Sequence, residues 1–135
     1  MQKSIMIVDD NEMTRGNLRQ LLSRSTDWTI CAEAVDGCDA VEKARLFRPD
    51  FIVMDFCMPN MDGLEAARKI KNLIPKSSIV MLSVFKDGYL EKKAYEAGIS
   101  WVLAKGEAGR VVDFARILLR SDPAFVTASA ASIGG

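Results

Sequence analysis

An apolar run that ends at a carboxylate constrains the fold of this chain more than any other stretch. Residues 51–54 read Phe-Ile-Val-Met, without the polar alternation of a half-exposed strand, and Asp55 follows them directly. Such a run is typical of a strand covered on both faces of a parallel sheet. Open α/β sheets place their ligand sites at the carboxyl ends of such strands. Asp55 is therefore a candidate site residue, and the alternative is that it only caps the following loop or helix.

Four other short apolar runs predict strands, and the segments between them have helical spacing. We expect these strands at residues 5–8, 28–34, 78–82 and 101–104. Pro49 ends the second helix, and Gly98 ends the fourth, which we expect at residues 89–97. The residues expected to face the core from the other helices are Leu18, Leu21, Leu22, Ala40, Val41, Ala44, Phe47, Leu64, Ala67, Ile70, Ile74, Val111, Val112, Ala115, Leu118 and Leu119.

Alternation of strands and helices decides the fold class. Five strands alternate with five helices, which predicts an α/β protein with a doubly wound five-stranded parallel sheet. Because crossovers between parallel strands are nearly always right-handed, helices cover both faces of the sheet. We expect one domain over residues 1–120, followed by an Ala/Ser/Gly-rich tail or linker over residues 121–135.

Composition excludes several function classes. Eighteen basic and eighteen acidic residues leave no net charge, which argues against a nucleic-acid partner. The three cysteines have no spacing typical of disulfides or zinc sites, and the absence of histidine removes His-based triads and imidazole ligands. No apolar run approaches the roughly 18 residues that span a bilayer. We therefore expect a cytoplasmic protein without membrane or direct nucleic-acid contacts.

Chemically active side chains follow four of the five predicted strands. Asp9 and Asp10 follow the first, Asp55 the third, Ser83 the fourth and Lys105 the fifth, and a parallel sheet brings all of them to one edge. Three carboxylates about 5 Å apart repel by roughly 3 kcal/mol per pair at an effective dielectric constant near 20. Oxygen ligands favour a hard cation such as Mg²⁺. The set predicts phosphoryl transfer to a carboxylate, with the metal and the lysine neutralising charge.

With these motifs the sequence resembles the receiver domain of two-component response regulators over about residues 3–120. That family has a flavodoxin-like fold with the strand and helix pattern described above. The residues that carry the resemblance are Ile7-Val8-Asp9-Asp10, Met54-Asp55, Met58-Pro59, Met61-Asp62-Gly63, Ser83 and Lys105.

The resemblance implies a role for each site residue. Asp55 would accept a phosphoryl group from the phosphohistidine of a sensor histidine kinase or histidine phosphotransfer protein. Asp10 and Asp55 would bind Mg²⁺ directly, Asp9 mainly through water, and Cys57 through its backbone carbonyl. Ser83 and Lys105 would hold the phosphoryl group. The surface of the fourth helix, fifth strand and last helix would then switch, control an output partner or domain, and offer a contact for a homodimer.

Three positions depart from the family pattern. Val102 stands where receivers commonly have an aromatic residue that reports phosphorylation, and strand alternation places Trp101 on the opposite side. We therefore expect the aromatic switch to be either weakened or replaced, with Phe85 as one candidate replacement. Val84 follows Ser83 where a small residue is common, which predicts slower hydrolysis of the acyl phosphate. Gly106 replaces a proline that often follows a cis bond, so we expect a trans bond, because a cis bond costs about 2.5–4 kcal/mol without proline.

Two other functions fit part of the pattern. An Asp-based phosphatase would share the carboxylates, Mg²⁺ and lysine, but it expects its nucleophile after the first strand with an acid two residues later. Asp9 is followed at that spacing by Asn11. The other alternative is a receiver-like interaction module that signals without phosphorylation. Because the acidic site is complete, this alternative rests only on the altered switch and loop positions.

Overall fold

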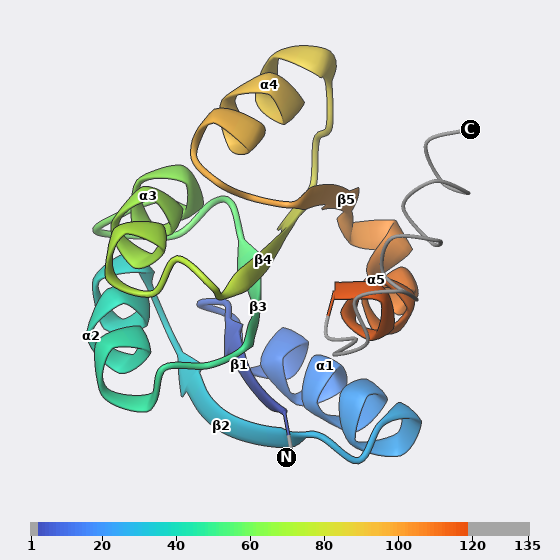
Figure 1. Cartoon of the computed structure of the whole chain (residues 1–135). Helices are drawn as coiled ribbons and strands as arrows, with labels where there is room; N and C mark the ends of the chain where they lie inside the picture. Colours follow the sequence, from blue (N-terminus) through green and yellow to red (C-terminus); the bar gives the residue numbers. More distant parts are fainter. Residues whose placement is uncertain (1–2, 119–135) are drawn as a thin grey trace.

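The computed structural model describes residues 3–118 and contains one parallel sheet between two layers of helices (Figure 1). The strands lie in the order β2-β1-β3-β4-β5, and all four neighbouring pairs are parallel. The predicted doubly wound α/β fold is therefore confirmed. In chain order the elements are β1 (Ser4–Val8), α1 (Glu12–Ser25), β2 (Thr29–Ala34), α2 (Gly37–Phe47), β3 (Phe51–Asp55), α3 (Gly63–Leu73), β4 (Ser78–Ser83), α4 (Gly88–Glu96), β5 (Trp101–Ala104), the 3-10 helix η1 (Lys105–Arg110) and α5 (Val111–Leu118).

Each face of the sheet has its own apolar core. Helices α2, α3 and α4 pack on one face, where Met6, Ile52 and Met54 contribute from the strands. Helices α1 and α5 pack on the other face, where the alternate residues Ile7 and Val53 contribute (Figure 1). The central strand β3 is buried along its whole length. Burial on both faces explains why its sequence lacks polar alternation.

Aspartate and asparagine side chains fix where four helices begin. Asn11, Asp36, Asp62 and Asp87 precede α1, α2, α3 and α4, and each accepts a hydrogen bond from a backbone N–H three residues later. These caps set the direction in which each helix leaves the carboxyl edge of the sheet. The four loops that lead into these helices run over residues 9–11, 35–36, 56–62 and 84–87.

Most predicted core positions are buried or half-buried, but the prediction that Phe47 faces the core is wrong. Its side chain is 51 % exposed, because Phe47 is the last residue of α2 and no described element covers that final turn. The second strand begins at Thr29, so Trp28 lies just before it. Gly98 has a φ of 94° after α4, as expected of a glycine at a helix end. Leu119 and the predicted tail over residues 121–135 lie outside the described residues.

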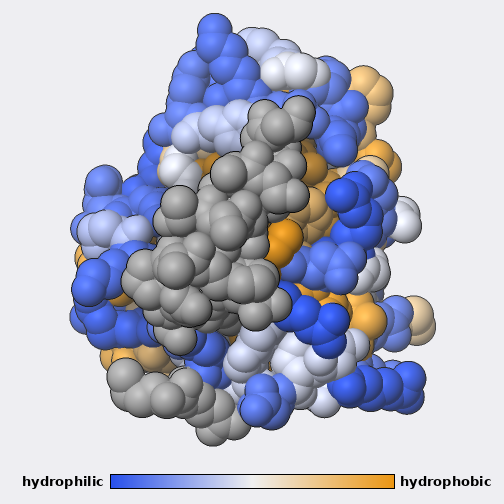
Figure 2. Space-filling model, turned by 45° about the vertical axis from the view of Figure 1, so that its right-hand side comes forward, coloured by the Kyte–Doolittle hydropathy of each residue, from blue (hydrophilic) through white to orange (hydrophobic). Residues whose placement is uncertain are grey.

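Where the face in Figure 2 is coloured, polar residues predominate and apolar groups appear between them in smaller patches. Val84, Phe85 and Tyr89 are among the large apolar or aromatic side chains that are exposed. All three lie in the segment that connects β4 to α4 or in the first turn of α4. Within residues 3–118, no helix has the length and apolar character needed to cross a membrane.

Candidate phosphoryl and metal site

The strand register brings the predicted site residues together. Strands β1 and β3 pair in parallel up to Val8 and Met54, so Asp9 and Asp55, the next residues, lie side by side at the carboxyl ends of the two strands. Strands β4 and β5 pair through Ser83 and Ala104, and Lys105 follows directly. Four strand ends therefore meet at one edge of the sheet, as expected for a site at the carboxyl ends of parallel strands.

Three carboxylates and one ammonium group form the centre of this edge. Asp9, Asp10 and Asp55 each place a carboxylate oxygen within 4.8 Å of the others. The Lys105 Nζ atom lies 3.4 Å from Asp55 Oδ2 and 3.5 Å from Asp9 Oδ2. Asp9 and Asp55 are buried, with 1 % and 3 % of their surface exposed, whereas Asp10 is exposed. The structure thus brings together four of the predicted site residues.

Burial and charge shift the proton affinity of two of these groups. Burial raises the pKa of the Asp55 carboxyl, and the nearby Asp9 carboxylate raises it further, although Lys105 and the backbone N–H of Cys57 act in the opposite direction. Partial burial opposes the charged form of Lys105, but Asp55 and Asp9 outweigh it and raise the pKa of the ammonium group. Asp55 is therefore held in a site that disfavours its own charge even with Lys105 beside it.

Hydrogen bonds hold the side chain, the backbone N–H and the backbone carbonyl of Asp9. Its Oδ1 atom accepts a hydrogen bond from Asn11 N at 2.8 Å, and its backbone N–H donates to Ala34 O at 3.1 Å. Its backbone carbonyl accepts a hydrogen bond from Arg15 Nη1 at 2.8 Å. Sequence reasoning missed Arg15, because an arginine in the first turn of a helix looks like any solvated cation. Its contact with a loop carbonyl depends on how α1 packs against β1.

Ser83 lies at the predicted edge, but its hydroxyl group bonds elsewhere. The Ser83 Oγ atom donates to Phe85 O at 2.5 Å and accepts from Phe85 N at 3.3 Å. Ser83 is buried at this edge. The side chain of the next residue, Val84, is 83 % exposed, and its effect on hydrolysis stays a prediction.

The loop between β3 and α3 lies close against Asp55. Gly63 N donates to Phe56 O at 2.9 Å, which closes the loop, and Met61 N donates to Pro59 O at 2.7 Å. A Cβ atom added at Gly63 would lie 2.7 Å from the backbone oxygen of Asp55. Cys57 is exposed in this loop, and the role of its carbonyl as a metal ligand stays a prediction.

The sheet separates Val102, which occupies the family's aromatic switch position, from Trp101, which precedes it. Val102 is buried in the core beneath α3 and α4, whereas Trp101 packs on the opposite side. The ring centroids of Trp101 and Phe114 are 4.5 Å apart. The prediction that the two residues face opposite sides is confirmed. No cis peptide bond occurs within residues 3–118, so the Lys105–Gly106 bond is trans, as expected.

The donor set of the acidic cluster fits a hard divalent cation. Three ionised carboxylates carry three negative charges and Lys105 carries one positive charge, so the cluster retains two negative charges. Every available side-chain ligand atom is a carboxylate oxygen, which matches the preference of Mg²⁺ for oxygen and for few protein ligands with several waters.

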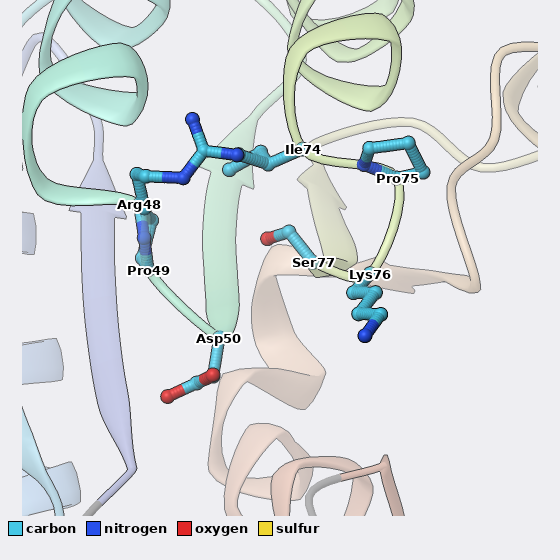
Figure 3. Close-up of a pocket in the computed structure, with 7 residues that line it drawn as sticks. All are labelled: Arg48, Pro49, Asp50, Ile74, Pro75, Lys76 and Ser77. Atoms are coloured by element: carbon cyan, nitrogen blue, oxygen red, sulfur yellow. The ribbon is translucent and has the colours of Figure 1, made fainter.

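A separate cavity of about 430 Å³ lies at the opposite end of β3 and β4. Figure 3 shows its lining, which consists of Arg48, Pro49, Asp50, Ile74, Pro75, Lys76 and Ser77. The Ser77 hydroxyl is buried there without a hydrogen-bond partner among the residues that the structure describes. Because the acidic cluster lies at the carboxyl ends of the strands, this cavity is not part of the candidate site.

A doubly wound sheet with three carboxylates and a lysine at its carboxyl edge is the architecture of a signalling receiver domain. The sequence profile of the response regulator receiver domain matches residues 5–113. The chain belongs to this family, which serves two-component signalling, and it is a signalling domain and not an enzyme of the usual kind.

Individual relatives agree with this assignment. The chain is 33 % identical over 126 residues to the response regulator protein VraR of Staphylococcus aureus, an alignment that covers 93 % of the chain and 60 % of VraR. The response regulator domain of CheB from Thermotoga maritima has a TM-score of 0.81 at 26 % identity, covering 91 % of this chain and all of that one. A LuxR-family response regulator from Aurantimonas sp. also has a TM-score of 0.81, at 29 % identity, covering 98 % of this chain and 97 % of that one.

Two consequences follow from these comparisons. The chain spans about 60 % of the length of the curated relatives it matches. The comparison therefore assigns the receiver domain and not the activity of the longer relatives. Membership of the receiver family stands against the Asp-based phosphatase that the carboxylates and lysine also suggested.

Proposed function

We propose that this receiver domain accepts a phosphoryl group on Asp55 with the help of Mg²⁺ and Lys105. The observation that carries the proposal is the position of Lys105 Nζ, 3.4 Å from Asp55 Oδ2 and within the cluster of three carboxylates. An ammonium group there can follow a phosphoryl oxygen as negative charge accumulates on it. The phosphodonor is the phosphohistidine of a sensor histidine kinase or a histidine phosphotransfer protein.

The transfer step forms one bond and breaks one. A carboxylate oxygen of Asp55 forms the new P–O bond, while the P–N bond to the donor imidazole breaks and its electron pair leaves with the imidazole nitrogen. When bound, Mg²⁺ supplies positive charge to the phosphoryl oxygens. Asp10, Asp55 and the carbonyl of Cys57 would hold the ion directly, and Asp9 would hold it mainly through water.

Ser83 completes the proposed site after a rotation of its side chain. A serine hydroxyl has one proton to donate, so a bond to the phosphoryl group replaces the bond to Phe85 O. Lys105 and Ser83 would then hold the group from β5 and β4. This change at the end of two strands is what we propose transmits the signal to the surface of α4, β5 and α5, which also offers a contact for a homodimer.

Labelling with a small phosphodonor tests the proposal without knowledge of the kinase. Incubated with acetyl phosphate and Mg²⁺, the protein should gain the mass of one phosphoryl group in an intact-mass spectrum, and a chelator should prevent the gain. Asp55→Asn should remove the labelling. Asp113→Asn, which changes an exposed aspartate on α5, is the matched control and should label like the original chain.

The domain boundaries belong to the same proposal. We assign the receiver to residues 1–120 and a linker or tail to residues 121–135, which would lead to an output domain or remain a short extension. The profile match over residues 5–113 lies inside the proposed receiver.

The hydrogen bond from the Ser83 hydroxyl to the Phe85 carbonyl favours a second function, in which the domain signals by protein contact without phosphorylation. In that case the hydroxyl would keep its bond to Phe85 O, and a phosphate mimic would not bind. Full labelling of the original chain together with loss of labelling in Asp55→Asn would exclude this second function. Labelling that survives in Asp55→Asn would refute the assignment of Asp55.

A further inference from the structure

Arg15 connects the metal-binding loop to the neighbouring strand. Its Nη1 atom donates to the backbone carbonyl of Asp9 at 2.8 Å, and its Nε atom lies 3.4 Å from Glu33 Oε1 on β2. The side chain is only 15 % exposed. A planar guanidinium with two fixed contacts holds its partners in a defined geometry, which a single ammonium group cannot do.

The carbonyl that Arg15 holds belongs to the peptide group between Asp9 and Asp10. Asp9 has further anchors, since its carboxylate bonds to Asn11 N and faces Lys105. The Asp10 carboxylate is exposed and has no hydrogen-bond or ion-pair partner among residues 3–118. The direction of the Asp10 side chain therefore depends on the plane of this peptide group, and Arg15 is the side chain that fixes it.

The same glutamate provides an internal comparison. Glu33 Oε2 lies 2.6 Å from Arg19 Nη1, so two arginines of α1 share one carboxylate. Arg19 makes no contact with Asp9 among the described residues. The two arginines thus carry the same charge and pair with the same partner, but only Arg15 contacts the acidic loop.

We infer that Arg15 is a positioning residue that orients Asp10 toward the Mg²⁺ site. This inference rests on the proposed function, because it assigns a purpose to Asp10 as a metal ligand. Arg15 acts through the Asp9 carbonyl and does not touch the metal or the phosphoryl group. Without it, the loop samples more orientations, and binding of the ion must first restrict them.

Mg²⁺ titration of the full 135-residue chain tests this inference by calorimetry. Arg15→Gln should raise the Kd for Mg²⁺ about three- to tenfold, the factor that one lost hydrogen bond typically represents. Arg19→Gln removes the same charge and the other contact to Glu33, and it should change the Kd less than about twofold. Arg15→Lys, which keeps the charge but not both contacts, should fall between the original chain and Arg15→Gln.

The thermal unfolding temperature of each variant without Mg²⁺ separates positioning from general stability. If Arg15→Gln lowers the unfolding temperature but leaves the Kd for Mg²⁺ unchanged, the inference is overturned. It is also overturned if Arg15→Gln and Arg19→Gln raise the Kd for Mg²⁺ equally, because that result would indicate a charge effect. If Arg15→Gln does not fold, the comparison of Arg15→Lys with Arg19→Gln decides in the same way. An original chain that binds no Mg²⁺ would refute the proposed function as well, whereas normal Asp55 labelling with an unaffected Arg15→Gln would refute the inference alone.

Discussion

Asp55 occupies a position that disfavours its own charge. Burial raises the pKa of its carboxyl group, and Asp9 adds repulsion that Lys105 only partly offsets. A charged group in such a site costs folding free energy, and a bound cation reduces that cost. The proposed phosphoacceptor is thus a residue whose charged form a bound Mg²⁺ would stabilise, so the proposal links metal binding to readiness for phosphorylation.

The raised pKa of Asp55 predicts a specific pH dependence of stability. A carboxyl group whose pKa is higher in the folded chain binds its proton more tightly there, so it stabilises the fold below its unfolded pKa and loses this contribution as the pH rises through the folded value. In the presence of a chelator, Asp55→Asn should therefore be more stable than the original chain at pH 7, with a difference that shrinks toward pH 4. Urea unfolding at several pH values measures this.

Asp113→Asn serves as the control for that experiment, because Asp113 is exposed on α5. It should leave the pH profile of the free energy of unfolding unchanged. A constant difference between Asp55→Asn and the original chain at every pH would contradict the proposed electrostatic cost.

At the scale of elements, the loops after the strands form the site, and the sheet fixes where they begin. The loop from β3 to α3 is closed by the bond from Gly63 N to Phe56 O and by the cap of Asp62 on α3. This closure places the start of α3 directly over the backbone of Asp55. The position of Asp55, the proposed phosphoacceptor, is therefore sensitive to the volume of the first residue of α3.

Gly63→Ala should destabilise the chain and disturb the site. The added methyl group would lie 2.7 Å from the Asp55 oxygen, which is closer than carbon and oxygen tolerate, so the loop must move. We expect a loss of about 1–3 kcal/mol in the free energy of unfolding and slower labelling by acetyl phosphate. Gly88→Ala, where nothing lies within 4 Å of the added Cβ, is the control. Equal stability of the two variants would contradict the tight packing at Gly63.

Much of the site could be predicted because the sequence indicates where each buried strand ends. The apolar runs before Asp9, Asp55 and Lys105 predict buried parallel strands, and parallel strands must end at one edge. The orientation of the Ser83 hydroxyl and the contact of Arg15 with the Asp9 loop could not be predicted. Both depend on rotations of side chains in the assembled fold, which residue spacing does not determine. Phe47 was misassigned for a similar reason, since its helical spacing continues where the covering layer ends.

At the scale of the whole molecule, the sheet separates Val102, at the usual aromatic switch position, from its neighbour Trp101. Val102 is held in one core and Trp101 stacks near Phe114 in the other. If Asp55 is phosphorylated as proposed, the aromatic residue that reports it has to lie elsewhere than position 102. Phe85 is a candidate, because its carbonyl accepts a hydrogen bond from the Ser83 hydroxyl and the residue is 70 % exposed.

Binding of beryllofluoride with Mg²⁺, a mimic of the phosphoryl group, should show this route by NMR. When Ser83 turns toward the mimic, Phe85 loses its bond, so the ring signals of Phe85 should shift while the methyl signals of Val102 stay in place. Signals from the Trp101 indole report whether the opposite core takes part. Unchanged signals for both Phe85 and Trp101 would refute the replacement of the aromatic switch.

Chemical mapping of the phosphorylated residue tests phosphorylation of Asp55 most directly. The chain is treated with acetyl phosphate and Mg²⁺, and borohydride then reduces the acyl phosphate to an alcohol, which converts a phosphorylated aspartate to homoserine. Peptide mass spectrometry should find homoserine at position 55 and at no other aspartate, and only when Mg²⁺ was present. Homoserine at another position, or the same yield at position 55 without Mg²⁺, would contradict a magnesium-dependent phosphoacceptor at Asp55.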